Sequence, residues 1–264
     1  MAAVLTPEVR VFPDLEALSR AAASGVAAAL RSAVETRGSC AVALAGGRTP
    51  RRVYEVLAES HGTEVRWDRV HIFWGDERYV PPDDPQSNYR LAREALLDRV
   101  PIPAANVHRM PTERSSPASA ARRYEALLRR HLGPRPRFDL VLLGLGADGH
   151  VASVFPGSPA VAEERRWVIA VEAPAGPRRR LTLTLPTINR AARVFIIVAG
   201  PQKAAALARA LMGPVDPWRH PASAVRPVDG SLVWWTDEAA AARLPGRHRH
   251  EGTPAGGAAR RRGP

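Results

Sequence analysis

The sequence predicts an α/β fold in which a largely parallel, Rossmann-like sheet carries helices on both faces. Short apolar segments typical of strands alternate along the chain with longer segments whose apolar residues recur at helical spacing. This alternation favours a parallel sheet, because successive parallel strands need a crossover connection, usually a helix. The segment 140–143 carries no charge and indicates a strand that is buried on both faces.

The individual elements follow from this spacing and from residues that begin or end helices. An Ala- and Leu-rich segment ends just before Gly38, Pro50 suits the first position of a helix, and Ser116 suits a helix cap. Helices are therefore expected over residues 14–35, 50–57, 87–97, 117–132, 201–211 and 237–243. Strands are expected over residues 39–45, 70–74, 140–143, 167–171, 181–185, 194–199 and 232–235.

Length and composition predict one folded domain followed by a tail. Apolar residues make up 45% of the 264, which is enough to bury a full core, so residues 1–244 are expected to form a single α/β domain. Residues 245–264 are rich in Arg, Pro, Gly and Ala. Such a segment cannot bury enough apolar area to fold, and we expect it to be a disordered basic tail.

Cysteine content and hydropathy indicate a cytoplasmic protein. The single cysteine, Cys40, excludes an internal disulfide and fits a reducing compartment. The sequence shows no charged-then-apolar leader and no apolar run of about 18 residues. We therefore expect a cytoplasmic protein that has no membrane partner.

The formal net charge of +12 suggests nucleic-acid binding, but the distribution of the charge does not favour it. Five arginines lie in the predicted tail, and the remaining excess is dispersed, without the aromatic-interleaved basic stripe of single-strand binders. No specific nucleic-acid partner is expected. Among the 38 basic residues only Lys203 is a lysine, and arginine does not replace a compact point charge, so Lys203 is a candidate functional residue.

The glycine-rich turn at residues 144–150 is the predicted active site. It follows the buried strand directly, and open α/β sheets bind ligands where their strands end. Asp148 and His150 in this turn are poor choices for packing but suit proton transfer. Two other interpretations are an Asx-turn with a surface histidine, and a G-x-G-x-x-G dinucleotide fingerprint. Pro156 and Pro159 interrupt the helix that the fingerprint requires.

Two further strand ends carry polar residues that would share the same edge of a parallel sheet. Residues 46–49, Gly-Gly-Arg-Thr, have the outline of a phosphate cradle, because the following helix offers unpaired N–H groups. The Lys-Ser/Thr ending of a nucleotide-binding loop is missing, which disfavours ATP. Asp76, Glu77 and Arg78 alternate in direction if they continue a strand, so at most two can face one pocket. A structural glycine turn and a solvated charge run are the respective alternatives.

Several longer segments carry a resemblance to known proteins. In order along the chain they are Leu44-Ala-Gly-Gly-Arg-Thr-Pro50, Phe73-Trp-Gly-Asp-Glu-Arg-Tyr-Val-Pro81, Ser87-Asn-Tyr-Arg-Leu-Ala-Arg-Glu94, Leu143-Gly-Leu-Gly-Ala-Asp-Gly-His-Val-Ala-Ser-Val-Phe-Pro-Gly157, Arg180-Leu-Thr-Leu-Thr-Leu-Pro186 and Lys203-Ala-Ala-Ala-Leu207. With them the sequence resembles the 6-phosphogluconolactonase family, part of a superfamily that includes glucosamine-6-phosphate deaminases. The resemblance extends from about residue 10 to residue 243.

This resemblance implies a glucosamine-6-phosphate deaminase-like fold. It also implies hydrolysis of 6-phospho-D-glucono-1,5-lactone to 6-phospho-D-gluconate, a step of the oxidative pentose phosphate pathway, without a metal or other cofactor. His150 would be the general base that activates water, while Asp148, Asp76 and Glu77 would orient or polarise the site. The residues that would bind the phosphate and lactone are Gly46, Gly47, Arg48, Thr49, Arg78, Arg180 and Lys203.

Partners other than this small sugar-phosphate lactone are not expected. The eight histidines form no H-x-x-x-H pair on a helix, which agrees with the expected absence of a metal. We expect the protein to be a monomer or a weak homo-oligomer.

Two positions depart from the family pattern, and two rival functions remain. Arg48 stands where the family often has Ser, and Val151 stands where it often has Thr. The rival enzyme is the deaminase, whose motif continues Ile-Ala-Phe-Asn-Glu after the histidine, whereas this chain has no carboxylate there until Glu163. The non-catalytic rival is a sugar-phosphate sensor, which usually adds a DNA-binding domain. A sensor that only binds phosphate requires neither Asp148 nor His150, so the presence of both residues favours an enzyme.

Overall fold

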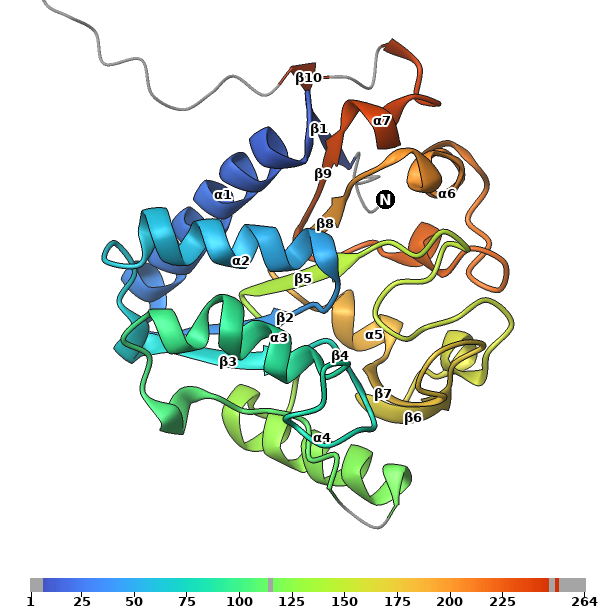
Figure 1. Cartoon of the computed structure of the whole chain (residues 1–264). Helices are drawn as coiled ribbons and strands as arrows, with labels where there is room; N and C mark the ends of the chain where they lie inside the picture. The colour runs from blue at the N-terminus through green and yellow to red at the C-terminus, as the bar shows by residue number, and fades with distance from the viewer. Residues whose placement is uncertain (1–6, 114–115, 247–249, 252–264) are drawn as a thin grey trace, which may run out of the picture.

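The central sheet of the protein has seven strands, all paired in parallel (Figure 1). The structure of the protein is a computed structural model, and it describes residues 7–113, 116–246 and 250–251. In order across the sheet the strands are β10 (His250–Glu251), β1 (Glu8–Phe12), β9 (Ser231–Asp237), β8 (Arg193–Val198), β5 (Leu140–Gly144), β2 (Cys40–Leu44) and β3 (Val70–Trp74). The predicted parallel α/β fold is confirmed.

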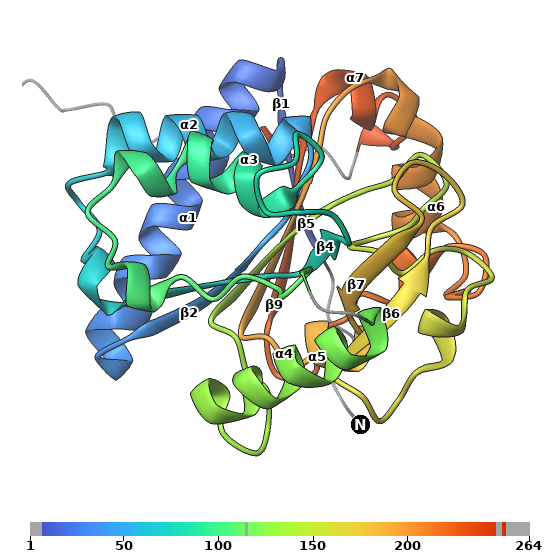
Figure 2. The ribbon, with the colours of Figure 1, turned by 60° about the horizontal axis from the view of Figure 1, so that its bottom comes forward.

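Helices cover both faces of this sheet, as the alternation of elements predicts. They are α1 (Leu15–Arg37), α2 (Arg48–His61), α3 (Asn88–Ala95), α4 (Pro117–Leu132), α5 (Leu185–Ile188), α6 (Ala204–Met212) and α7 (Glu238–Ala241). Figure 2 shows α1, α2 and α3 together on one side of the sheet, with α4 and α5 on the other. Short 3-10 turns occupy Trp67–Arg69, Leu97–Arg99, Ala104–Asn106, Pro159–Ala162, Pro201–Lys203 and Pro221–Ala224.

A second sheet is antiparallel and has three strands. In order they are β4 (Asp76–Arg78), β7 (Arg179–Leu183) and β6 (Val168–Glu172). The segments predicted as strands at 167–171 and 181–185 therefore belong to this sheet and not to the parallel one. Strand β4 was not predicted, because its three charged residues form a strand only through backbone pairing with β7, far along the chain.

Burial explains why β5 lies inside the main sheet, between β8 and β2. Leu140, Val141 and Leu142 have no measurable exposure, so this strand is covered on both faces as its uncharged sequence indicates. Full burial of one such side chain contributes roughly 1.5–3 kcal/mol of transfer free energy.

Helix α1 is fixed at its start by Asp14, whose carboxylate accepts the backbone N–H of Ala17 over 2.8 Å.

The carboxyl ends of four neighbouring strands meet at one edge of the main sheet. Leu44 of β2 lies opposite Trp74 of β3, and Gly144 of β5 lies opposite Ile197 of β8. Since the strands are parallel, the turns that follow them all leave the sheet on this side. The three polar turns predicted from the sequence therefore share one edge.

The end of the chain adds a short strand to the sheet. Of the predicted tail, residues 245–246 and 250–251 are described, and β10 pairs with β1, which the composition of the tail does not predict. The other tail residues, with the five arginines, lie outside the described residues.

Cys40 is a free, buried thiol. Throughout the described parts of the chain, every helix is too short or too polar to cross a membrane.

Candidate active site

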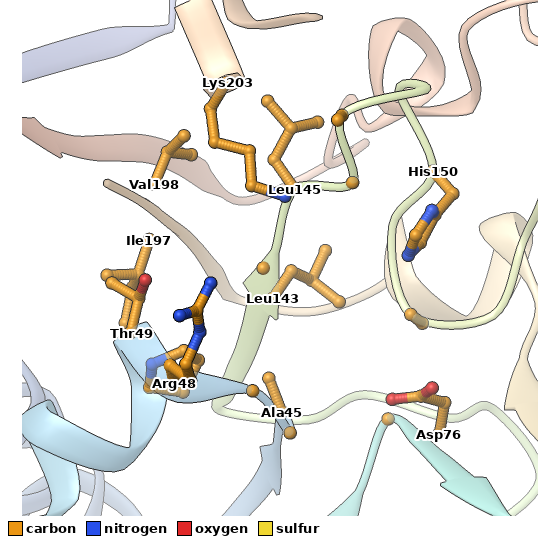
Figure 3. A pocket seen from close by; sticks show the side chains of 18 of the residues that line it. Ala45, Arg48, Thr49, Asp76, Leu143, Leu145, His150, Ile197, Val198 and Lys203 are labelled. Carbon is orange, nitrogen blue, oxygen red and sulfur yellow. The ribbon is translucent and has the colours of Figure 1, made fainter. Parts of the chain in front are cut away.

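A pocket of about 520 Å³ opens at the carboxyl edge of the main sheet (Figure 3). Its size is in the range of small-molecule sites. The turns that follow β2, β3 and β5 all contribute to its wall, so the polar residues predicted at three strand ends meet in one place. The predicted site residues that line it are Gly46, Gly47, Arg48, Thr49, Asp76, Arg78, Asp148, His150, Arg180 and Lys203.

His150 and Asp148 form a hydrogen-bonded pair in this pocket. His150 Nδ1 lies 2.6 Å from Asp148 Oδ1, which also accepts the backbone N–H of His150 over 3.2 Å. Partial burial opposes ionisation of Asp148, but the hydrogen bonds and the nearby charge of His150 lower the pKa of its carboxyl. The carboxylate holds a proton on Nδ1, which leaves the Nε2 lone pair to act as a base. Figure 3 shows the imidazole pointing into the pocket.

The backbone of this turn is shaped around the His150–Asp148 pair. A Cβ atom at Gly146 would overlap both His150 Nδ1 and Asp148 Oδ1, so only glycine fits there. Gly149 has a φ of +94°, and its N–H donates to the Gly146 carbonyl over 3.1 Å. The chain continues from Gly149 into turns and not into a helix, so the dinucleotide interpretation of these glycines is wrong.

Asp76 is a second carboxylate in the pocket, and its orientation is fixed by two neighbours. Ser153 Oγ donates to Asp76 Oδ2 over 2.6 Å. Asn88 Nδ2 donates to the Asp76 carbonyl over 2.9 Å and to Oδ1 over 3.3 Å. Asp76 is only 7% exposed, and Figure 3 shows its carboxylate turned toward the pocket.

Glu77 does not line the pocket, because the next side chain along β4 points the other way. Its carboxylate accepts the backbone N–H groups of Arg78, Asn88 and Tyr89 over 2.7 to 2.8 Å. Burial raises the pKa of Glu77 to about 7, although these N–H donors act in the opposite direction. Glu77 therefore anchors the start of α3 and bears on the pocket only indirectly, through its bonds to the backbone of Asn88 and Arg78, which line it.

The far end of the pocket from His150 is cationic. Arg48 begins α2, and Lys203 ends the 3-10 turn that precedes α6; the two side chains enter the pocket from opposite sides (Figure 3). Burial and the charge of Arg48 lower the pKa of Lys203, while Asp148 opposes this effect. Gly47, with a φ of +105°, precedes α2 and makes no side-chain cap. The first N–H groups of α2 are thus available to an anion.

Arg78 and Arg180 form a second cationic group, beside Asp76. They are cross-strand partners in the β4–β7 pair. Each is held by one backbone carbonyl: Arg78 Nη1 donates to Gln86 over 2.6 Å and Arg180 Nε donates to Pro177 over 2.7 Å. Burial and the charge of Arg78 lower the pKa of Arg180. Two cations held this close favour an anionic or strongly polar ligand group.

Four residues at the site that carry polar or aromatic side chains were not among the predicted site residues. Asn88, Phe155 and Gln202 line the pocket, and Ser153 lies behind it in contact with Asp76. Three of them fall inside segments that carry the family resemblance, which is the only signal for them in the sequence. Their spacing along the chain does not predict contact with Asp76 or His150.

Comparisons with known proteins place this geometry in a family. Residues 13–234 match the family model described as glucosamine-6-phosphate isomerases/6-phosphogluconolactonase. The chain belongs to this family. A protein of Synechocystis named 6-phosphogluconolactonase is 41% identical over 244 residues, which cover 91% of this chain and 99% of that protein.

Solved structures of the glucosamine-6-phosphate isomerase/6-phosphogluconolactonase family share the fold. The 6-phosphogluconolactonase of Trypanosoma brucei has a TM-score of 0.81 at 29% identity, covering 92% of this chain and 100% of that chain. A monomeric glucosamine-6-phosphate deaminase has a TM-score of 0.77 at 24% identity, covering 89% of this chain and 99% of that chain. The latter likeness concerns the fold alone. The predicted family and the deaminase-like fold are confirmed.

Proposed function

We propose that the protein is a 6-phosphogluconolactonase, which hydrolyses 6-phospho-D-glucono-1,5-lactone to 6-phospho-D-gluconate in the oxidative pentose phosphate pathway. The observation that carries this proposal is the polarity of the pocket. An acid–base pair, His150 and Asp148, lies at one end and two cations, Arg48 and Lys203, lie at the other. A substrate with a phosphate at one end and an electrophilic carbonyl at the other fits this arrangement. The lactonase name of relatives about 40% identical supports the same choice.

In the proposed reaction His150 Nε2 removes a proton from water as the water oxygen attacks the lactone carbonyl carbon. A tetrahedral intermediate forms, with negative charge on the former carbonyl oxygen. Its collapse breaks the bond between that carbon and the ring oxygen, which takes the proton back from His150. Asp148 keeps Nδ1 protonated and stabilises the imidazolium formed in the first step.

The phosphate is proposed to bind at the start of α2. There the phosphate oxygens can accept the backbone N–H groups of Arg48 and Thr49, because the glycine turn at Gly46 and Gly47 lets the backbone come close to a ligand. Lys203 supplies a compact positive charge. Binding there would place the carbonyl at the opposite end of the pocket, next to His150.

The remaining polar residues are proposed to act on the sugar and on the developing charge. Asp76 accepts hydrogen bonds from substrate hydroxyl groups in the orientation that Ser153 and Asn88 impose. Arg78 and Arg180, held by backbone carbonyls beside Asp76, act as donors to anionic oxygens of the substrate. Preorganised donors of this kind need no rearrangement during the reaction.

The proposal needs only one chain and no cofactor. We propose a monomer or a weak homo-oligomer as the active form. We propose residues 1–244 as one catalytic domain, because β1 and β9, from opposite ends of that range, pair in the same sheet. The free thiol of Cys40 supports a reducing, cytoplasmic location.

A coupled assay tests the proposed reaction. The lactone is generated fresh by glucose-6-phosphate dehydrogenase, and 6-phosphogluconate formation is followed above the spontaneous rate, with and without EDTA. We expect fast hydrolysis that EDTA does not change. Hydrolysis at the spontaneous rate, with release of ammonia from glucosamine 6-phosphate instead, would show that the site belongs to a deaminase.

A further inference from the structure

Three histidines converge at the edge of the main sheet where β3 begins, opposite the carboxyl edge that forms the reaction pocket. His71 Nδ1 lies 3.1 Å from His108 Nε2, and one ring nitrogen from each of His71, His108 and His131 falls within 4.8 Å of the others. Two nitrogens bound to one tetrahedral zinc lie about 3.3 Å apart, given Zn–N bonds of about 2.0–2.1 Å. The spacing of the first pair is close to this value, so a small movement of the exposed His131 completes the set.

These histidines come from three separate parts of the chain. His71 lies at the start of β3, while His108 follows a 3-10 turn and its backbone N–H donates to the Ile72 carbonyl over 2.8 Å. His131 lies in the last turn of α4. The amino end of β3 is remote from the carboxyl edge that forms the reaction pocket, so none of the three lines that pocket.

We propose that His71, His108 and His131 form a binding site for one divalent transition-metal ion, with zinc as the ion it takes. Imidazole nitrogen is a preferred ligand of zinc, and three histidines with an open fourth position are an established zinc geometry. A cavity of about 360 Å³ adjoins His71 and His131, which gives water access to that fourth position. Within the described residues, this is the one group of at least three such side chains close enough to share an ion.

The surroundings prepare the three rings for binding. Phe73 stacks on His108 with ring centroids 4.7 Å apart and meets His131 edge-on at 5.6 Å, which limits rotation of both rings. Burial lowers the pKa of all three histidines, so they are neutral and able to act as ligands at neutral pH.

The nearby arginines do not block a cation. Arg37 lines the adjoining cavity but is paired with the carboxylate of the buried Asp139. Arg137 also lines it and donates to the Asp229 carbonyl over 2.9 Å. One of these two charges is therefore compensated, and the other is held toward a backbone oxygen. The remaining positive charge, which includes Arg130 near His131, makes binding weaker than at an acidic zinc site.

Calorimetric titration of zinc chloride into the untagged, full-length protein tests the proposal. The matched variants are His131→Gln, which removes the most exposed ligand; His61→Gln, which removes a histidine outside the cluster; and His150→Gln, which removes the histidine of the reaction pocket. We expect one zinc per chain for the wild-type protein and for the last two variants. His131→Gln is expected to weaken zinc binding at least about tenfold.

A second readout is the melting temperature, which zinc should raise in the wild-type protein but not in His131→Gln. The proposal is overturned if the wild-type protein fails to bind zinc, or if His131→Gln binds it unchanged. Loss of binding in His61→Gln or His150→Gln alone would overturn it as well, since the ion would then sit elsewhere. Lactone hydrolysis is measured separately, so failure of the metal site and failure of the proposed function are distinguishable.

Discussion

Ser153 donates its hydroxyl hydrogen to Asp76 Oδ2 over 2.6 Å, which joins the loop after His150 to the short strand β4. The two residues are far apart in the sequence, and both are almost wholly buried. The loop itself is held by the backbone N–H of Ser153, which donates to Thr182 Oγ1 over 3.1 Å. The acid–base pair and the second carboxylate of the pocket are thus fixed relative to each other.

Removing the Ser153 hydroxyl should lower turnover without unfolding the protein. We expect Ser153→Ala to reduce kcat several-fold, because Asp76 loses one of the two donors that orient it, while the melting temperature changes little. Ser158→Ala is the matched control, since the Ser158 hydroxyl is buried and has no hydrogen-bond partner among the described residues. Equal kcat values for the two variants would contradict a positioning role for Ser153.

Removing the imidazole of His150 should abolish most of the proposed hydrolysis. General-base catalysis contributes typically about 10²–10⁴-fold, so we expect His150→Ala to lower kcat within that range while KM changes little. Asp148→Asn should lower kcat less, because Nε2 remains but the charge that stabilises the imidazolium is lost. The measurement is the coupled lactone assay, with circular dichroism to check the fold. Turnover near that of the wild-type protein in His150→Ala would remove this residue from the mechanism.

Truncating Lys203 should weaken substrate binding more than turnover. We expect Lys203→Ala to raise KM at least about tenfold with a smaller change in kcat, as for the loss of an interaction present in both ground and transition states. Arg209→Ala removes a positive charge from an exposed position on α6 and serves as the control. If both variants raise KM equally, the effect is one of overall charge and not of contact with phosphate.

Glu77 should give the protein a distinctive pH dependence of stability. Burial raises the pKa of Glu77 from 4.5 to about 7, so between these pH values the folded protein holds a proton that the unfolded chain has released. The contribution of Glu77 to the free energy of unfolding should therefore fall as pH rises from 4.5 to 7, on the order of 3 kcal/mol at 1.36 kcal/mol per pH unit. The lowered pKa values of His71, His108 and His131 act in the opposite direction in this range, so the effect of Glu77 is measured as the difference between the wild-type protein and Glu77→Gln.

Urea unfolding at several pH values measures this effect. Relative to Glu77→Gln, the wild-type protein should lose stability as pH rises from 4.5 to 7. Glu125→Gln is the control, because burial raises the pKa of Glu125 but its hydrogen bonds, to Arg129, Arg166 and two backbone N–H groups, outweigh burial and lower it. That lowered pKa confines the titration of Glu125 to more acidic solutions. A difference in stability between the wild-type protein and Glu77→Gln that stays constant from pH 4.5 to 7 would contradict the prediction.

Local signals in the sequence were sufficient to predict the parallel sheet, except for β1 and β10, and the turn that carries His150. An uncharged strand such as β5 indicates burial on both faces, and glycines next to ionisable residues at the end of such a strand indicate a functional turn. The alternation of side chains also predicted that at most two of Asp76, Glu77 and Arg78 face one pocket. Which two do so depends on the pairing of β4 with β7, and no local pattern reveals that pairing.

The spacing of histidines along the sequence did not predict the histidine cluster, for a related reason. Metal sites are recognised in sequences by short, regular intervals, whereas His71, His108 and His131 are separated by long stretches that include a helix and several turns. The packing of α4 against β3 brings His131 to His71, and the pairing of the loop before His108 with β3 adds the third ring. Ser153 and Asp76 are likewise joined only by tertiary contacts.

The place of β1 between β9 and β10 has a consequence for how the chain folds during synthesis. Glu8 pairs with Val233 and Arg10 pairs with His250, so β1 leaves the ribosome long before either of the strands that it pairs with. Until those segments emerge, the two edges of β1 stay unpaired, and contacts between such distant segments form slowly. Completion of the sheet therefore waits until residues 231–251 have been made, and a nascent chain that stalls before residue 231 presents open strand edges to other molecules.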